Sequence, residues 1–436
     1  MTNMTALWRR VVILLVVVIA ILQVIHMTLL SRLEARKNGS LRSGDKSDWQ
    51  SQQEYQEAQL KKDMTRMLET IKQSSVLDSS GEYRIINFVM RAENLGVKNN
   101  VRQDLSLVTQ STIKHLVHLE SILGRWHGPV SVAIFSLTQD IPLAIDAILN
   151  IRRCIPAARS NTSFHLVYPL NSPYNKAPSP QPLVLDPCET IKDRIQSFQI
   201  SDNYAHGVPY PNNLLRNVGR RNALTDFVFV IDIDMVPNDN LYSDFIDFAV
   251  VNKLFIDSHK DDKTVYVVPA FEVKEGVEVP RDKTGLLQLL ELMEARPFYF
   301  ELCWKCQKHT DYETWQKEPP TPKLNVIFEV LWRDPWEPFY IGRNVAPFYD
   351  ERFRQYGFNR LSQVCELHVS GYKFSVLNNA FIVHRGLKTP NSFHKDKETD
   401  QEKNRQLFRQ FKFELKEKIR AVIESVFRNK KRGEYL

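Results

Sequence analysis

The hydrophobic pattern begins with one long apolar segment close to the N-terminus. Residues 11–22 read Val-Val-Ile-Leu-Leu-Val-Val-Val-Ile-Ala-Ile-Leu, and no Asp, Glu, Lys or Arg interrupts the stretch before Leu30. About 20 such residues span a bilayer as a helix. The apolar part of a cleavable signal peptide is shorter, about 7–15 residues, and no small-x-small cleavage site follows here. The pattern predicts an uncleaved transmembrane signal anchor at 11–30, after a cytoplasmic tail at 1–10.

A polar segment, residues 31–80, separates this stretch from the rest of the chain. Within it Leu60, Met64, Met67 and Ile71 recur at a spacing of about 3.5 residues, which predicts a short amphipathic helix. Two heptads are too few for a stable coiled coil, so we interpret the segment as a stem with a weak tendency to dimerise. A homodimer and an association with another enzyme both remain open.

Beyond the stem, short apolar runs alternate with stretches of helical periodicity. Residues 130–137 predict a strand, 141–154 a helix and 164–168 a second strand, and further strands are expected at 227–231 and 265–268. Apolar runs without strict alternation are typical of strands covered on both faces. The sequence therefore predicts one α/β domain at 81–436, with a central, Rossmann-like, largely parallel sheet and helices on both faces.

The chain ends in a stretch with a clear helical stripe. Apolar residues recur every fourth position within a helix expected at about 398–427. These residues are Leu407, Phe411, Leu415, Ile419, Ile423 and Phe427. Such a stripe normally packs on a core, so we expect it to support the domain and not to contact a substrate.

The net charge of +7 and the pI near 9.0 would suit a protein that binds a polyanion. However, Lys and Arg are interspersed with Asp and Glu nearly everywhere, and the densest basic run, residues 428–432, lies at the C-terminus. Such a run is usually a solvated tail. The charge pattern therefore argues against nucleic acid as a partner.

The charges that flank the apolar stretch do not decide its orientation, because basic residues lie on both sides of it. No second apolar span follows, and two acceptor triplets for N-glycosylation lie beyond it, Asn38-Gly-Ser and Asn161-Thr-Ser. We therefore expect glycosylation at Asn38 and Asn161, and a lumenal location for residues 81–436.

Five cysteines, an odd number, are spread over this domain. One or two disulfides are possible, and at least one thiol must remain. Cys303 and Cys306 have the spacing of a redox dithiol or of half a zinc site, but no second pair of cysteines or histidines accompanies them. We interpret them as structural, and an oxidising lumen would allow a short-range disulfide between them.

The strongest chemical signal is the run Asp-Phe-Val-Phe-Val-Ile-Asp-Ile-Asp-Met-Val-Pro at 226–237, in which an apolar strand ends at Asp232 and Asp234. Ligands of open α/β sheets collect beyond the carboxyl ends of the strands. Paired carboxylates there could hold Mg²⁺ or Mn²⁺, which commonly share their ligand shell with substrate phosphates. Such an ion would stabilise a diphosphate leaving group as a Lewis acid. The alternative is a turn in which the aspartates cap backbone amides.

Residues 212–223 predict a helix that leads into this strand, with Asn213, Arg216, Asn217 and Arg220 on neighbouring turns. Arginine binds phosphate through two parallel hydrogen bonds, and asparagine can bind hydroxyls and amides of a sugar or base. We therefore predict that these four residues, with Asp232 and Asp234, bind a nucleotide-sugar donor. A solvated helix face is the competing interpretation.

At this point the chain resembles a known family, the glycosyltransferases that build the dystroglycan glycan. The matching stretches are Leu-Leu-Arg-Asn-Val-Gly-Arg at 214–220, the run at 226–237, Phe-Tyr-Asp-Glu-Arg-Phe-Arg-Gln-Tyr-Gly-Phe-Asn-Arg at 348–360 and Val-Leu-Asn-Asn-Ala-Phe-Ile-Val-His at 376–384. The resemblance extends from about Gly81 to the C-terminus. One catalytic domain on a short stem is closer to the glucuronyltransferase branch than to the two-domain polymerases.

The resemblance implies a glycosyltransferase-A fold and an inverting reaction that depends on Mn²⁺ or Mg²⁺. It further implies transfer of glucuronic acid from UDP-glucuronate, in β-1,4 linkage, to a terminal xylose on an O-mannosyl glycan of a glycoprotein, which primes later elongation. The expected location is the Golgi membrane, as a single-pass type II protein. A β-1,3-N-acetylglucosaminyltransferase of similar fold, or an inactive lumenal glycan-binding or scaffold protein, are the alternatives.

The resemblance also implies further site residues. His384, which follows the strand-like 381–383, is expected as a third metal ligand beside Asp232 and Asp234. An inverting transfer needs a carboxylate that accepts the proton of the acceptor hydroxyl. Related enzymes often carry it in an acidic motif after an aromatic-glycine loop, but here residues 356–359 lead into Arg360. The candidates for this base are Asp350 and Glu351, with Glu366 behind them.

Two features remain open at this level. The aromatic stretch at 332–340 could stack on an acceptor sugar or belong to the core. A glucuronate donor also needs a cation for its carboxylate, and the sequence offers several without selecting one. These cations are Arg220, Arg221, Arg343, Arg385 and Lys388.

Overall fold

The computed structural model describes residues 23–24, 27–29, 57–95, 102–170, 186–256, 261–389 and 397–431, with side chains to residue 421. The predicted cytoplasmic tail, almost all of the predicted anchor, Asn38 and most of the Pro-rich loop before Cys188 lie outside these residues. Within the described part of the chain, no helix is long and apolar enough to span a membrane.

The chain divides into two compact units, residues 1–64 and 65–436, and the following concerns the second. Residues 57–73 are helical, which confirms the short helix predicted in the stem. The strand β1 (Ser75–Leu77) then pairs antiparallel with β2 (Tyr83–Met90). The sheet thus begins before Gly81, where the sequence placed the start of the domain.

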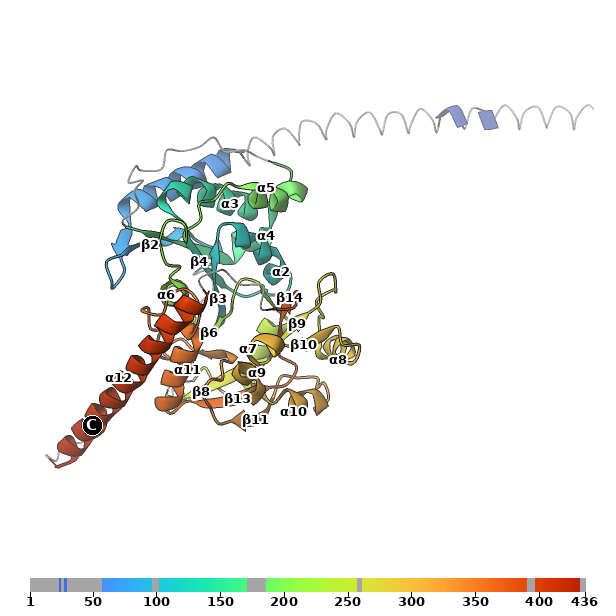
Figure 1. The fold of residues 1–436 in the computed structure, drawn as a ribbon. Coiled ribbons are helices and arrows are strands. Elements are labelled where there is room, and N and C mark those ends of the chain that lie inside the picture. The colour runs from blue at the N-terminus through green and yellow to red at the C-terminus, as the bar shows by residue number, and fades with distance from the viewer. Residues whose placement is uncertain are drawn as a thin grey trace, which may run out of the picture. The chain divides into compact units, whose positions relative to one another are not determined.

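Among the described residues, ten strands form one sheet in the order β1-β2-β5-β4-β3-β6-β12-β8-β13-β11 (Figure 1). Its parallel part contains β5 (Thr162–Pro169), β4 (Val130–Phe135), β3 (Leu105–Thr112) and β6 (Phe227–Val230). Every residue of β4 and β6 is buried, as expected for strands covered on both faces. The predicted strands and the mixed α/β class are confirmed.

The other half of the sheet corrects the expectation of a largely parallel arrangement. It contains β12 (Phe339–Arg343), β8 (Thr264–Val268), β13 (Lys373–Leu377) and β11 (Val326–Val330). Of the pairings in this half, β8 with β13 is parallel and the others are antiparallel. Apolar runs predict strands, but the connections between strands decide their direction, so the sequence pattern could not show this.

A second, four-stranded sheet lies next to the predicted site. Its order is β10 (Ala295–Pro297), β9 (Ala270–Val273), β14 (Ile382–Arg385) and β7 (Met235–Pro237). In the antiparallel pairing of β14 with β7, His384 lies opposite Met235. Because Asp234 immediately precedes Met235, this register brings two distant parts of the sequence to one point.

The helix α6 (Asn212–Arg221) packs closely on β3 and β4, as the sequence predicted for a helix that leads into β6. Its apolar residues Leu214, Leu215 and Val218 belong to the core beneath the parallel strands. At Gly219 a Cβ atom would lie 2.6 Å from Cγ1 of Val108, so the close approach of helix and sheet requires glycine. The position of α6 thereby fixes which side chains it turns to the site.

The other longer helices lie along the chain in the following order, as Figure 1 shows. They are α2 (Leu119–Leu123), α3 (Ile141–Cys154), α4 (Pro156–Ser160), α5 (Ile191–Ser197), α7 (Leu241–Val251), α8 (Lys283–Glu291), α9 (Phe300–Gln307), α10 (Tyr312–Lys317), α11 (Asn359–Val369) and α12 (Lys397–Lys431). In α12, Phe408, Phe411 and Leu415 pack on Phe353 and Leu361, which confirms the predicted stripe over its described part.

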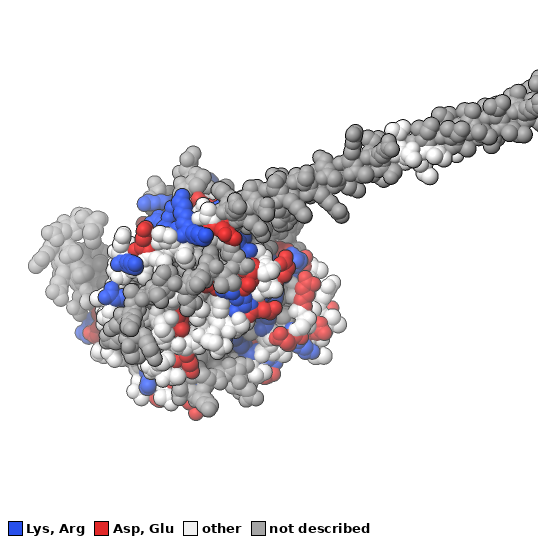
Figure 2. All heavy atoms as spheres, turned by 90° about the horizontal axis from the view of Figure 1, so that it is seen from above, with Lys and Arg blue, Asp and Glu red and all other residues white. Residues whose placement is uncertain are grey.

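Two disulfides form, and Cys365 remains a buried free thiol, which agrees with the sequence analysis. Cys154, at the end of α3, bonds to Cys188, and Cys303 bonds to Cys306 within α9. On the face shown in Figure 2, basic and acidic side chains are interspersed. This distribution agrees with the argument against a polyanion surface.

Candidate active site

A pocket of about 1020 Å³ opens beyond the carboxyl end of β6, and Asp232 and Asp234 line it. Its walls come from α6, α9, the segment 334–337 and α12. Both carboxylate side chains are partly exposed to it, 29% for Asp232 and 34% for Asp234. The two aspartates therefore face a cleft at the strand end, where the sequence placed them.

Asp232 is held between two arginines. Its Oδ1 accepts a hydrogen bond from Arg216 Nη2 at 3.0 Å, and its Oδ2 accepts one from Arg360 Nη2 at 2.8 Å. The Arg360 guanidinium in turn lies 3.6 Å from the ring centre of Phe339. Burial would raise the pKa of Asp232, but the charges of Arg360 and Arg216 outweigh it and lower the pKa. Asp232 is therefore ionised, with an arginine on each oxygen.

Asp234 lies against His384 and Lys388. Its Oδ2 is 3.1 Å from His384 Nε2 and 3.3 Å from Lys388 Nζ. The other ring nitrogen, Nδ1, lies 2.7 Å from the carbonyl oxygen of Gly386 and must donate to it, because a carbonyl only accepts. Burial would raise the pKa of Asp234, yet the hydrogen bond from His384 and the nearby positive charges lower it.

These residues fit a divalent cation that shares its ligands with a substrate. In an octahedral shell with bonds of about 2.1 Å, neighbouring ligand atoms lie about 3.0 Å apart, close to the spacing of Asp234 Oδ2 and His384 Nε2. A histidine whose Nδ1 donates to a backbone carbonyl, as in His384, is the usual arrangement of a metal-bound imidazole. Within the described residues, no three His, Cys, Asp or Glu side chains could hold a metal ion together. Phosphate and water would have to supply the other ligands.

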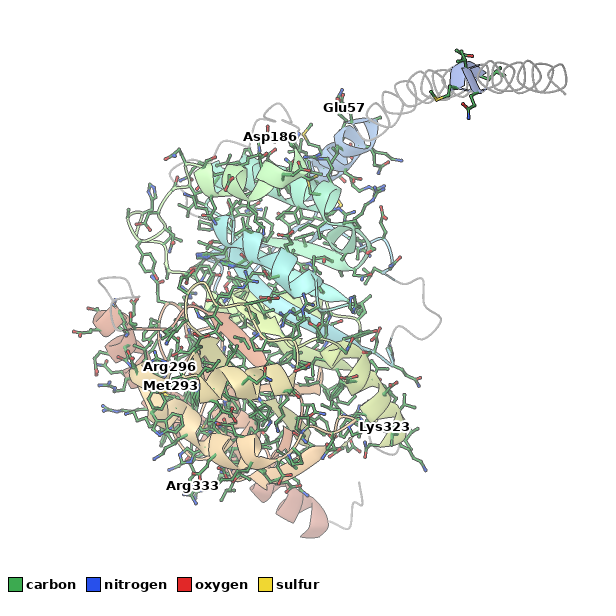
Figure 3. All side chains as sticks on the ribbon, turned by 90° about the vertical axis from the view of Figure 1, so that its right-hand side faces the viewer. Glu57, Asp186, Met293, Arg296, Lys323 and Arg333 are labelled. Atoms are coloured by element: carbon green, nitrogen blue, oxygen red, sulfur yellow. A yellow bond between two sulfur atoms is a disulfide. The ribbon has the colours of Figure 1, made fainter. Side chains whose placement is uncertain are left out.

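A buried acidic residue supports the segment that carries Lys388. Glu272, on β9, is fully buried; its Oε1 accepts from Arg296 Nε at 2.6 Å and its Oε2 from the Lys388 backbone N–H at 3.2 Å. Arg296 is labelled in Figure 3, and it also pairs with Glu301 at the start of α9. This network joins β9, α9 and the segment after β14 at one edge of the pocket.

Of the five cations considered for the donor, Lys388 lines the pocket. Arg220 and Arg343 are buried and donate to backbone carbonyls, and Arg221 pairs with Glu351. Arg385 is exposed. The structure therefore reduces the open choice of the sequence analysis to one residue in contact with Asp234.

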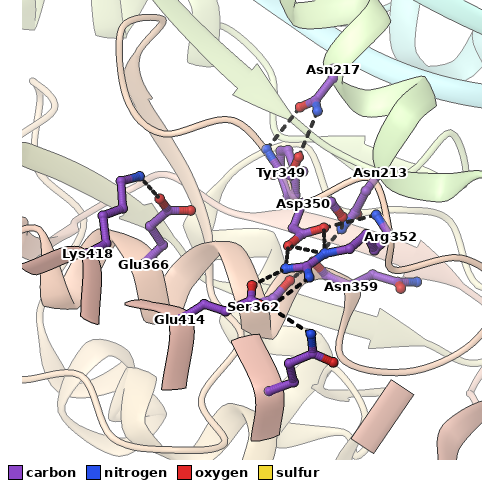
Figure 4. Close-up of polar contacts among 11 residues, drawn as sticks. Asn213, Asn217, Tyr349, Asp350, Arg352, Asn359, Ser362, Glu366, Glu414 and Lys418 are labelled. Atoms are coloured by element: carbon purple, nitrogen blue, oxygen red, sulfur yellow. Dashed lines mark hydrogen bonds and ion pairs between the residues drawn. The ribbon is translucent and has the colours of Figure 1, made fainter. Parts of the chain in front are cut away.

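The face of α6 predicted to bind the donor is mostly turned elsewhere. Asn213, Asn217 and Arg220 do share one face with Arg216, but they donate hydrogen bonds to backbone carbonyls at 344–350 (Figure 4). All three are buried and do not line the pocket, which Arg216 does. The spacing showed correctly that they share a face, but not that the face packs on a loop.

The two carboxylates proposed as the base do not meet Asp232 and Asp234 in one pocket. Asp350 and Glu351 line a separate pocket of about 440 Å³. Asp350 pairs with Arg352 at 2.6 Å, as Figure 4 shows, and Glu351 pairs with Arg221 at 2.8 Å. Glu366 pairs with Lys418 on α12. The geometry gives these three residues structural ion pairs and offers no support for a catalytic role.

The aromatic stretch at 332–340 belongs mainly to the core. Trp336, Phe339 and Tyr340 are 0%, 2% and 8% exposed. A different aromatic residue lines the pocket, Tyr299, whose ring stacks on Phe298 with centres 4.1 Å apart. Tyr299 precedes α9 in a left-handed conformation, with φ of 59°. The sequence gave no signal for it, because its position depends on that turn.

Several other pocket residues were also missed. His115 and His118, on the short helix at 114–118, line the pocket, and burial lowers the pKa of each. Glu337 and Arg360 line it as well. Arg360 stood out in the sequence because it interrupts the expected acidic motif, and its contact with Asp232 gives it a role. The predicted glycosylation residue Asn161 follows α4, where its Nδ2 donates to the His127 carbonyl.

Comparisons with known proteins agree with this site. A family described as glycosyl-transferase for dystroglycan matches residues 104–420. The chain is 36% identical to a protein from Danio rerio named beta-1,4-glucuronyltransferase 1, over 94% of this chain and 96% of that one. It is 40% identical to the Homo sapiens protein of the same name, over 79% and 81%.

A more distant relative is the xylosyl- and glucuronyltransferase LARGE2s from Gallus gallus. It is 28% identical, over 70% of this chain and 34% of that protein. The family resemblance predicted from the sequence is confirmed, including the greater similarity to the single-domain branch.

Proposed function

Because the chain belongs to the family of glycosyltransferases for dystroglycan, we propose that it transfers glucuronic acid from UDP-glucuronate to a terminal xylose. The new bond is β-1,4, and the acceptor is an O-mannosyl glycan on a glycoprotein, where the product primes later elongation. The observation that carries this proposal is the similarity to two proteins named beta-1,4-glucuronyltransferase 1, which extends over most of their length.

The pocket supports a nucleotide-sugar donor, with the sheet arranged as in the glycosyltransferase-A fold. Asp234 and His384 would hold Mn²⁺, or Mg²⁺, together with the diphosphate of the donor. The imidazole ligand favours Mn²⁺, because Mg²⁺ prefers oxygen ligands. The metal, when bound, acts as a Lewis acid that stabilises the departing UDP. Asp232 would complete this end of the pocket as a carboxylate oriented by Arg216 and Arg360.

Lys388 is the cation we assign to the acidic donor. It lines the pocket, and Glu272 fixes its backbone, so its ammonium reaches the pocket from a held position. An ammonium paired with Asp234 becomes available to a phosphate or carboxylate when a metal takes over that aspartate. Tyr299 offers an aromatic face on which a sugar ring can stack.

We further propose that the protein is a single-pass type II protein of the Golgi membrane, with the apolar stretch at 11–30 as its anchor. Residues 31–80 would then serve as the stem, and Asn38 and Asn161 would carry glycans. The apolar composition of the stretch and the acceptor triplets beyond it support this topology. A homodimer, or association with another glycosyltransferase, stays a prediction from the stem.

The test uses the full chain purified in detergent, with Mn²⁺, a β-xyloside acceptor and a series of UDP-sugars. We expect UDP release and a disaccharide product with UDP-glucuronate alone, lost on addition of a chelator and in Asp232→Asn. Turnover with UDP-N-acetylglucosamine would instead favour the β-1,3-N-acetylglucosaminyltransferase alternative. Glycan binding without turnover of any donor would favour a scaffold protein.

A further inference from the structure

Glu337 is an acidic residue of the pocket that the proposed donor site does not use. It lies in the wall formed by residues 334–337, and the same pocket contains Asp232 and Asp234. Its backbone is fixed on both sides. The N–H of Glu337 donates to the Cys306 carbonyl at 2.9 Å, and Trp336 before it is fully buried. The wall therefore presents this carboxylate from a rigid position.

The other three carboxylates of the pocket are engaged by cations. Asp232 is bound by Arg216 and Arg360, Asp234 contacts Lys388, and Asp334 pairs with Lys412 at 3.3 Å. For Glu337, by contrast, no hydrogen-bond donor or paired cation lies in contact with its carboxylate among the described residues. Its oxygens are thus available to a ligand in the pocket.

The surroundings of Glu337 favour proton acceptance. Burial raises the pKa of Glu337, and the charges of Arg360 and Arg216 oppose this rise only in part. A general base works best when its pKa lies near the operating pH, and a carboxylate without a cation is more basic than one in an ion pair. Asp232 and Asp234 have lowered pKa values and are weaker bases for this reason.

We infer that Glu337 is the general base of the transfer, a role that rests on the proposed function. Its carboxylate takes the proton from the acceptor hydroxyl as that oxygen forms a bond to the anomeric carbon of the donor sugar. The bond between this carbon and the β-phosphate oxygen breaks, and its electron pair leaves with UDP. One proton moves to Glu337, and no other reactant is needed.

Two substitutions of Glu337 separate proton acceptance from a structural role. Glu337→Gln keeps the length of the side chain and removes its basicity, whereas Glu337→Asp keeps the carboxylate and shortens it. We expect kcat to fall by about 10²–10⁴-fold in Glu337→Gln and less in Glu337→Asp. UDP affinity in the presence of Mn²⁺ should stay within about twofold in both. A residue needed only for packing or hydrogen bonding would tolerate Gln better than Asp.

Asp334→Asn provides the matched control, because Asp334 lines the same wall three residues earlier and pairs with Lys412. Its kcat should remain within about threefold of the wild type. A Glu337→Gln protein with a kcat within threefold of the wild type, or above that of Glu337→Asp, would overturn the assignment. Failure of the wild type to turn over UDP-glucuronate would contradict the proposed function itself, so the two failures are distinguishable.

Discussion

The side chain of Asn217 forms two hydrogen bonds with the backbone of Tyr349, in the manner of a paired strand. Its Nδ2 donates to the Tyr349 carbonyl at 2.8 Å, and its Oδ1 accepts the Tyr349 N–H at 2.9 Å (Figure 4). Asn217 is 1% exposed, so water does not compete for these bonds. Asn217 therefore fastens the segment at 349–351 to α6, and it is far from free to bind a donor.

Asn217→Ala should destabilise the protein by about 2–3 kcal/mol, because it leaves a buried N–H and carbonyl of Tyr349 without partners. Urea unfolding measures the loss. The KM for the donor should stay within twofold. Asn252→Ala is the control, since Asn252 is exposed and donates to the carbonyl of Phe248 within its own helix, α7. A raised donor KM at unchanged stability would restore the donor-binding role predicted from the sequence.

The pairing of Asp234 with His384 predicts where the metal binds. His384→Ala should weaken Mn²⁺ binding by at least about a hundredfold, measured by electron paramagnetic resonance in the presence of UDP. Arg385→Ala, one residue further along β14, removes an exposed side chain outside the pocket and should leave the affinity unchanged. Equal Mn²⁺ affinity in the two variants would exclude His384 as a ligand.

The two disulfides should differ in their contribution to stability. Cys154 and Cys188 are separated by 34 residues and Cys303 and Cys306 by 3. Loss of loop entropy in the unfolded chain gives about 4 kcal/mol for the first pair and about 1.6 kcal/mol for the second. We expect the double Cys→Ser variant of the first pair to unfold at a clearly lower denaturant concentration than that of the second. The reverse order would show that native-state contacts, and not loop length, dominate.

The sequence predicted features that depend on local patterns. The strands at 130–135 and 227–230 are continuous apolar runs, and α12 has a regular apolar stripe, so each could be identified alone. Asp232 and Asp234 were found because a strand end and a pocket coincide in this class of fold. His384 came only from the family resemblance, and the register of β14 against β7 explains its position.

The features that the sequence could not show depend on distant partners. Asn213 and Arg220 seemed available for a ligand because their partners, the carbonyls at 344–350, lie more than a hundred residues away in the chain. Glu337 was hidden in an aromatic stretch interpreted as a possible acceptor platform. The burial of Trp336 and Phe339 turns that stretch into the core, and this leaves Glu337 facing the pocket.

His165 predicts a dependence of stability on pH that is separate from the active site. It is 0% exposed on β5, where its Nδ1 accepts the Phe88 N–H at 2.9 Å and its Nε2 lies 3.1 Å from Ser131 Oγ. Burial, with a smaller contribution from the Arg91 charge, lowers the pKa of His165 to about 3. The folded state therefore keeps the ring neutral, whereas the unfolded chain binds a proton below about pH 6.5.

The contribution of neutral His165 to stability is therefore complete above about pH 6.5 and is lost as the pH falls toward 3. Between pH 7 and 5 this loss is about 2 kcal/mol. Unfolding of the wild type and of His165→Gln in urea at both pH values measures it, because other groups titrate alike in the two proteins and cancel in the difference. The stability advantage of the wild type over the variant should shrink by that amount at pH 5. A constant advantage would mean that the ring becomes protonated in the folded state.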